Sequence, residues 1–145
     1  MAQSNGMTQR VRDVMTTPPV TLPATSSITE AARAMRDANI GGVIVVENGQ
    51  VCGIVTDRDL VVRGIAEGRD MARLKLADIS SRVLTTVSPT DSVDDAIQLM
   101  REKAIRRLPV IEGGKPVGIV AIGDLAIAQN PSSALGHISA APANH

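Results

Sequence analysis

Aromatic side chains are missing from this chain of 145 residues, which contains no Phe, Tyr or Trp. Without aromatic rings it offers no platform on which nucleobases could stack and no aromatic cage for a cation. Net charge is missing too, because 15 basic and 15 acidic residues cancel. This balance gives no electrostatic reason to expect nucleic acid or an anionic membrane as a partner. The core must therefore be built from Val, Ile, Leu, Met and Ala.

Cysteine, histidine and long apolar runs are scarce. The single Cys52 cannot form an internal disulfide, which favours a reducing compartment, and its apolar surroundings favour a buried, inert thiol. No segment has the length of a membrane span, and the polar start, Met1 to Gln9, lacks the apolar stretch of a signal peptide. The two histidines, His137 and His145, have no clustered partners for a metal ion. We expect a soluble, cytoplasmic protein without a metal site or a cofactor.

The first half of the chain carries alternating helix and strand signals. Ser27 and Glu30 form a capping box, which predicts a helix that runs to about Asn39. The residues expected on the inner face of this helix are Ile28, Ala31, Ala32 and Met35. The other expected elements are a short helix near residues 11–15, strands at 20–22, 43–46 and 51–56, a turn at 48–49 and a helix at 57–66.

The second half repeats the first at a constant offset of 65 residues. Residues 28–60 lie over residues 93–125 without a gap, and 12 of these 33 positions are identical. The corresponding elements are a short helix at 76–79, a strand at 85–87, a weaker capping box at Ser92 and Asp95, strands at 108–111 and 117–121 around a turn at 113–114, and a helix to about residue 129. Met100 is expected on the inner face of the helix that Ser92 opens.

The repeat predicts the fold class. Each half is a βαββα unit that is too small to bury its own sheet and helices, so two halves related by a pseudo-twofold axis would close one core. We therefore predict an α+β fold, with two three-stranded sheets packed together and the helices outside. The expected boundaries are a flexible arm at 1–9, the first repeat at 10–67, a connector at 68–75, the second repeat at 76–130 and a disordered tail at 131–145.

Each repeat ends with a similar polar motif. Residues 52–60 read Cys-Gly-Ile-Val-Thr-Asp-Arg-Asp-Leu, and residues 117–125 read Val-Gly-Ile-Val-Ala-Ile-Gly-Asp-Leu. Two βαββα repeats, each with Gly-apolar-apolar-(Thr)-x-x-Asp before its last helix, resemble a pair of cystathionine-β-synthase (CBS) domains, together a Bateman module. The Arg-Arg-Leu-Pro-Val string at 106–110 strengthens the resemblance, and residues 63–70 are similar to small stand-alone bacterial members. The resemblance covers about residues 10–130.

The resemblance implies a regulatory module that binds adenosine-containing ligands such as AMP, ADP, ATP, NAD or S-adenosylmethionine in clefts between the repeats. By position, Asp59 and Asp124 would hold ribose hydroxyls, and Thr56 would bind ribose or phosphate. The main chain around Val20 and Thr85 would line the adenine pocket. The other positions implied for ligand contact are Arg58, Arg106, Arg107, Leu108, Pro109 and Ile122, with the arginine pair facing phosphate.

Elementary chemistry supports these roles and also offers a simpler interpretation. A carboxylate can accept two hydrogen bonds from a sugar diol, and arginine can balance phosphate charge. Thr56 and Asp59 would equally serve as an N-cap and a first-turn acid of the following helix. One copy alone favours capping. Because Ala121 cannot cap whereas Asp124 remains, the second copy shifts the balance toward a ligand role. Arg58 is expected at the surface, and a solvated pair at a helix end is the alternative for Arg106 and Arg107.

Two functions remain in competition. The first is a non-catalytic nucleotide sensor acting on an unknown protein target, and the second is a dimerisation or stress-associated interaction scaffold that binds no nucleotide. An enzyme is disfavoured, since no His-based triad, Gly-rich phosphate loop with Lys or metal cluster is present. A homodimer is expected, because the outer helices carry apolar residues: Leu60, Val61, Ile65, Leu125 and Ile127.

The two motifs also differ in a way that predicts unequal sites. The second copy lacks the hydroxyl of Thr56, so we expect one tighter site that depends on Thr56 and Asp59, and a weaker one at Asp124. Arg106 and Arg107 stand where the first repeat has glycines, and they are expected to face the phosphates of the ligand held by Asp59.

Overall fold

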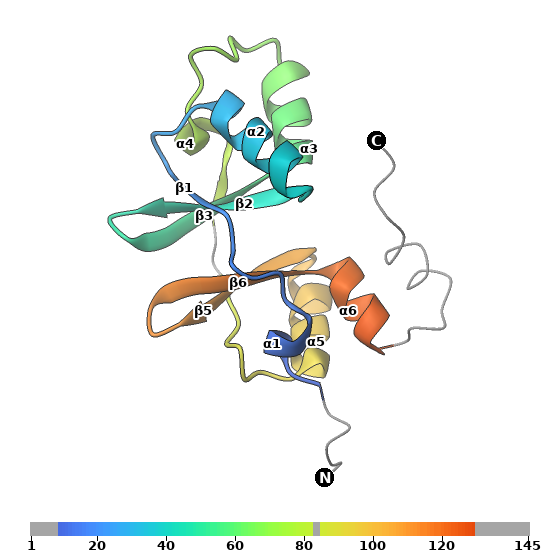
Figure 1. The fold of residues 1–145 in the computed structure, drawn as a ribbon. Coiled ribbons are helices and arrows are strands. Elements are labelled where there is room, and N and C mark those ends of the chain that lie inside the picture. Colours follow the sequence, from blue (N-terminus) through green and yellow to red (C-terminus); the bar gives the residue numbers. More distant parts are fainter. Residues whose placement is uncertain (1–8, 83–84, 130–145) are drawn as a thin grey trace. The chain divides into compact units, whose positions relative to one another are not determined.

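The computed structural model describes residues 9–82 and 85–129. Its contacts divide the chain into two compact units (Figure 1). The first-repeat unit is Pro19–Leu84, and the second-repeat unit joins Met1–Pro18 to Thr85–His145. The flexible arm expected at 1–9, apart from Gln9, and the disordered tail expected at 131–145 lie outside the described residues.

A four-stranded sheet with the order β1-β2-β3-β4 forms the framework of the first-repeat unit. Its strands are β1 (Thr21–Pro23), β2 (Gly42–Glu47), β3 (Gln50–Thr56) and β4 (Ser81–Arg82). β1 and β2 are parallel, while β2 and β3 form an antiparallel hairpin, as predicted. Asn48 and Gly49 make the hairpin turn with φ of 54° and 77°, the left-handed backbone that such two-residue turns require.

Helices of the first-repeat unit cover one face of this sheet (Figure 1). They are α2 (Ile28–Ala38), α3 (Asp57–Asp59), the π-helix η2 (Leu60–Ile65) that continues α3, and α4 (Leu76–Ile79). Ser27 and Glu30 form the predicted capping box, and Asn39 ends α2 in the left-handed conformation. The core between helices and sheet contains Ile28, Ala31, Met35, Val43, Val45, Val55, Leu60, Leu74, Leu76 and Ile79.

The second-repeat unit has the same plan. Its elements are α1 (Val11–Val14), α5 (Val93–Lys103), the antiparallel strands β5 (Arg107–Glu112) and β6 (Lys115–Ala121), and α6 (Ile122–Gln129). Val87 forms a parallel bridge with Val110, and Thr16 an antiparallel bridge with Ile119, in the places of β1 and β4. The core contains Val11, Val87, Val93, Ala96, Met100, Leu108, Val110, Val120 and Leu125.

The offset of 65 residues holds for helices, strands and turns alike. It also relates α1 to α4, but each of these short helices packs in the unit of the other repeat: α1 contacts β6 and α6, and α4 contacts β3 and η2. The compact units therefore follow packing, whereas the boundaries expected from the sequence follow the repeat.

One glycine in each motif is explained by this exchange. A Cβ on Gly53 would lie 2.9 Å from the Ser81 carbonyl oxygen, and a Cβ on Gly118 would lie 3.0 Å from the Thr16 carbonyl oxygen. In each unit the chain that follows the short helix crosses so close to the last long strand that only glycine fits.

The α+β fold of two repeats is confirmed, and several details differ from the expectations. The helix expected at 57–66 is α-helical only to Asp59, and the strand expected at 85–87 is a single bridge at Val87. β4 adds a fourth strand that no sequence pattern signalled. Ala32 is exposed, because the buried stripe of α2 runs along Ile28, Ala31 and Met35 with Ala34 at its edge.

The expected outer apolar patch is also smaller. Leu60 and Leu125 belong to the cores of their units, with 9% and 0% exposure, so neither can form an outer patch. Val61 and Ile65 are 54% and 62% exposed, and Val62 joins them at 41%.

Candidate functional site

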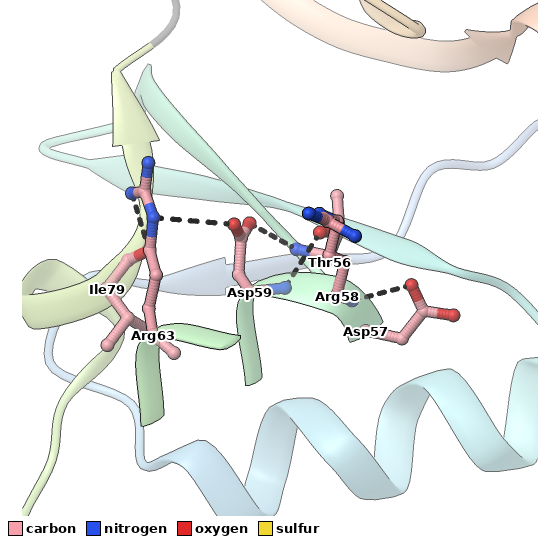
Figure 2. A network of polar contacts seen from close by, with 6 residues as sticks. All are labelled: Thr56, Asp57, Arg58, Asp59, Arg63 and Ile79. Atoms are coloured by element: carbon pink, nitrogen blue, oxygen red, sulfur yellow. Dashed lines mark hydrogen bonds and ion pairs between the residues drawn. The ribbon is translucent and has the colours of Figure 1, made fainter. Parts of the chain in front are cut away.

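The first copy of the motif lies where β3 ends and α3 begins (Figure 2). Thr56 Oγ1 accepts the Asp59 N–H at 3.1 Å, and Asp59 Oδ2 accepts the Thr56 N–H at 2.9 Å. The two residues therefore form a reciprocal capping box. Only 14% of the Asp59 side chain is exposed. Capping occupies Asp59 Oδ2 and leaves Oδ1 without a hydrogen bond from the described residues.

Arg63 faces that second oxygen. Its Nε lies 3.8 Å from Asp59 Oδ1, one helical turn along the chain. Its Nη1 donates a hydrogen bond of 3.3 Å to the carbonyl of Ile79, the last residue of α4 (Figure 2). A carbonyl at a helix C-terminus has no partner within the helix and carries partial negative charge, so a guanidinium suits it. Arg63 thus joins the motif acid to the end of α4.

The second copy keeps half of the capping box. The Ala121 N–H donates to Asp124 Oδ2 at 2.9 Å, but Ala121 has no hydroxyl to accept an N–H in return. Burial raises the pKa of Asp124 above its ordinary value, against the hydrogen bond from Ala121 and the positive charge of Arg107, which both lower it. This carboxyl is therefore less favourably ionised than an exposed aspartate.

These contacts change the weight of the sequence argument. The persistence of Asp124 beside Ala121 favoured a ligand role, on the ground that Ala121 cannot cap. Asp124 nonetheless accepts the backbone N–H of Ala121, just as Asp59 accepts that of Thr56. Capping of the helix start therefore accounts for an acid in both copies. Capping and ligand binding remain compatible, because a carboxylate has about four lone-pair sites and the cap uses one.

The implied phosphate-facing residues lie beside the second motif. Arg106 is exposed, and its carbonyl accepts the Ile122 N–H at 2.8 Å. Arg107 is half-buried and pairs with Ala121 across the hairpin. Both arginines therefore flank the start of α6 within one unit. That they face the phosphates of the ligand held by Asp59 stays a prediction.

The remaining implied residues divide by burial. Leu108 and Pro109 are fully buried, and Leu108 belongs to the core of the second-repeat unit. Arg58 is exposed, as expected, and Ile122 is 48% exposed. Val20 and Thr85 are half-buried, with the Val20 carbonyl accepting the Ile44 N–H at 2.9 Å. The first-repeat unit thus holds Val20, Thr56, Arg58 and Asp59, and the second-repeat unit holds the others.

A cavity beside Asp124 was not anticipated from the sequence. Its volume is about 380 Å³, and it is lined by residues of α1, the segment before it and α6: Gln9, Asp13, Val14, Asp124, Ile127 and Ala128. No sequence signal indicated it, because it depends on the packing of α1 in the second-repeat unit. Arg63 was also missed, although its spacing of four residues from Asp59 on a predicted helix was a usable signal.

Two absences hold for the part of the chain that the structure describes. Within residues 9–82 and 85–129, no three His, Cys, Asp or Glu side chains gather as metal ligands would. Among the same residues, no helix has both the length and the apolar character needed to cross a membrane.

Comparisons with known proteins agree with this architecture. A family model described as the CBS domain matches residues 11–64 and again residues 76–130. The CBS domain-containing protein YhcV of Bacillus subtilis is 41% identical over 126 residues, which cover 87% of this chain and 89% of that protein.

Two solved structures extend the likeness to three dimensions. The CBS-domain containing protein ATU1752 from Agrobacterium tumefaciens has a TM-score of 0.73 at 29% identity, covering 83% of this chain and 99% of that one. The CBS domain pair of protein MJ0100, solved in complex with 5′-methylthioadenosine and S-adenosyl-L-methionine, has a TM-score of 0.76 at 26% identity, covering 87% and 99%. CBS-domain proteins are generally non-catalytic regulatory modules. With two matched domains and a relative this similar along most of its length, the chain belongs to the CBS-domain family as a tandem CBS pair, a regulatory module.

Proposed function

We propose that this CBS pair is a non-catalytic sensor of adenosine-containing ligands, of which AMP, ADP, ATP, NAD and S-adenosylmethionine are the candidates. The observation that carries the proposal is the pair of motif acids, each held by a backbone N–H at the start of the last helix of its repeat. The similar pair in MJ0100 was solved with two adenosine compounds, which supports the same ligand class.

The carboxylate of Asp59 suits a ribose. Capping uses Oδ2 once, and the remaining lone pairs can accept hydrogen bonds from both hydroxyls of a vicinal diol. The Thr56 oxygen already accepts an N–H, but its hydroxyl hydrogen can still be donated to a ribose or phosphate oxygen. At Asp124 the same diol chemistry applies. Arg106 and Arg107 supply positive charge for the phosphates of the ligand held by Asp59. In this proposal the main chain at Val20 and Thr85 contacts adenine.

Thermal unfolding in the presence of each ligand tests the proposal. Far-UV circular dichroism is the suitable signal, because the chain has no aromatic residue for intrinsic fluorescence. A ligand at about a hundred times its Kd should stabilise the fold by about 2.7 kcal/mol, and the gain should shrink in Asp59→Ala. If no adenine nucleotide at millimolar concentration raises the melting temperature, the chain is a scaffold and not a sensor.

The proposal includes a cytoplasmic homodimer that acts on a protein target. Val61, Val62 and Ile65 expose apolar surface on η2, and a twofold interface would cover it. Light scattering should give twice the chain mass at tens of micromolar, and Ile65→Glu should reduce the measured mass to that of one chain. A wild-type monomer at that concentration would contradict the assembly without affecting the ligand site.

A further inference from the structure

Arg63 connects two features of the first-repeat unit that have separate tasks. Asp59 is the proposed ligand acid, and α4 leads through Ser80 into β4, the last element before the chain passes into the other unit. Arg63 is the residue drawn between them in Figure 2, with Nε toward Asp59 and Nη1 bonded to Ile79. Ile79 itself is 1% exposed, so the carbonyl that Arg63 binds belongs to a packed residue at the end of α4.

The geometry distinguishes the two contacts of Arg63. The contact with Asp59 Oδ1, at 3.8 Å, is an ion pair without a hydrogen bond, so it orients the carboxylate and leaves the lone pairs of Oδ1 to a ligand. The contact with the Ile79 carbonyl, at 3.3 Å, is a hydrogen bond that fixes the guanidinium. Asp59 is mostly buried while Arg63 is half exposed, so solvent screens this pair less than a fully exposed one.

The second copy lacks the arrangement. Ala128 stands at the position 65 residues after Arg63, and it packs against the core of the second-repeat unit. The two motif acids therefore share the backbone cap but differ in what faces their other oxygen. Among the residues that the structure describes, a side-chain link from motif acid to short helix is found in the first-repeat unit alone.

We propose that Arg63 is a positioning residue that orients the Asp59 carboxylate for a ligand. Through Arg63, ligand binding at Asp59 is coupled to the end of α4 and to β4. The ligand part of this inference rests on the proposed function. The apo part, in which Arg63 couples Asp59 to α4, stands on the two contacts alone. A ligand hydroxyl on Oδ1 changes the field at Arg63, and Arg63 is tied to a carbonyl that ends α4, so the α4–β4 segment responds.

The first test needs no ligand. Hydrogen exchange is followed at the amide of Ser80, which bonds to Leu76 within α4, in Arg63→Met, in Asp59→Asn and in the double variant. Asn keeps an acceptor for the Thr56 N–H while removing the charge. Asp59→Asn should speed exchange at Ser80 about two- to fivefold, the range expected for a partly exposed ion pair. Arg63→Met should speed it at least as much, because it also loses the bond to Ile79, and the double variant should match Arg63→Met. Additive effects, or no effect of Asp59→Asn at Ser80, would overturn the coupling.

The second test uses S-adenosylmethionine as the probe in calorimetric titrations. Arg63→Met should bind about two- to fivefold more weakly than the wild type, Arg63→Lys should recover most of this loss, and Arg63→Met in the Asp59→Asn background should lose nothing further. Arg73→Met is the matched control, because Arg73 forms an exposed ion pair with Asp70 at 3.4 Å in the same unit. Equal or tighter binding by Arg63→Met would overturn the positioning role. If the wild type binds no probe, the proposed function fails for this ligand and the exchange experiment still decides the coupling.

Discussion

Thr56 and Ala121 allow the energetic value of the capping box to be measured in both directions within one chain. Thr56 Oγ1 accepts the Asp59 N–H at 3.1 Å, and Ala121 occupies the equivalent position without a hydroxyl. Replacing an N-cap Thr by Ala costs about 0.5–2 kcal/mol, typically about 1 kcal/mol. We therefore expect Thr56→Ala to lose, and Ala121→Thr to gain, about 1 kcal/mol in the free energy of unfolding.

The structure explains why the gain should be close to the loss. Both positions are half-buried, both precede a helix, and both already bond through the backbone N–H to the motif acid. The new hydroxyl in Ala121→Thr only has to accept the Asp124 N–H to complete the box. Thr56→Ser keeps the acceptor and should stay within about 0.5 kcal/mol of the wild type.

Urea unfolding followed by far-UV circular dichroism measures these differences. A change of about 1 kcal/mol moves the urea midpoint by roughly 0.3–1 M, because the m-value of a small protein is about 1–3 kcal/mol/M. The reasoning would be refuted if Thr56→Ala were as stable as Thr56→Ser, or if Ala121→Thr were destabilising. Either result would mean that the hydroxyl is not what holds the helix start.

Three further predictions follow from individual contacts. Gly53→Ala should lower the free energy of unfolding by about 1–3 kcal/mol in urea unfolding, because its Cβ would lie 2.9 Å from the Ser81 carbonyl oxygen and the backbone must shift. If the variant were as stable as the wild type, β4 would be shown to move aside at little cost. Asp124→Asn should gain stability relative to the wild type as pH rises above about 4: the raised pKa makes the folded state bind the proton more tightly, so rising pH costs wild-type stability there. A constant difference between pH 4 and 7 would contradict this. In titrations with the ligand that binds best, Asp59→Ala should lose more affinity than Asp124→Ala; equal losses, or a larger loss from the second, would mean that the tighter site is not the one at Asp59.

The repeat made most of the fold predictable. Local signals such as the capping box at Ser27 and the Asn48-Gly49 turn depend on neighbouring residues, and the constant offset then assigned the same elements to the second half. What the pattern could not assign was packing between distant segments. Residues 11–14 do not indicate that α1 packs on α6, and the sequence around Ser81 does not indicate that it lies against Gly53. Both contacts depend on the direction that the chain takes after each short helix.

The candidate site was predictable in residue identity and less so in chemistry. The motif identified Asp59, Asp124 and Thr56, but only the three-dimensional structure shows that the cap uses one oxygen of each acid. The burial that raises the pKa of Asp124 comes from packing around α6 and leaves no mark in the local sequence. Arg63 could have been found from helical spacing, whereas its bond to Ile79 could not.

The most direct test of the central claim is a calorimetric titration of the wild type and Asp59→Ala with AMP, ATP, NAD and S-adenosylmethionine. At least one of the four should bind the wild type. Asp59→Ala should lower the affinity for that ligand about ten- to hundredfold. This is the equivalent of about 1.5–3 kcal/mol for the loss of a charged acceptor of ribose hydroxyls. Absence of binding heat with all four ligands at millimolar concentration, or equal affinity in Asp59→Ala, would contradict the claim that this acid holds an adenosine ligand.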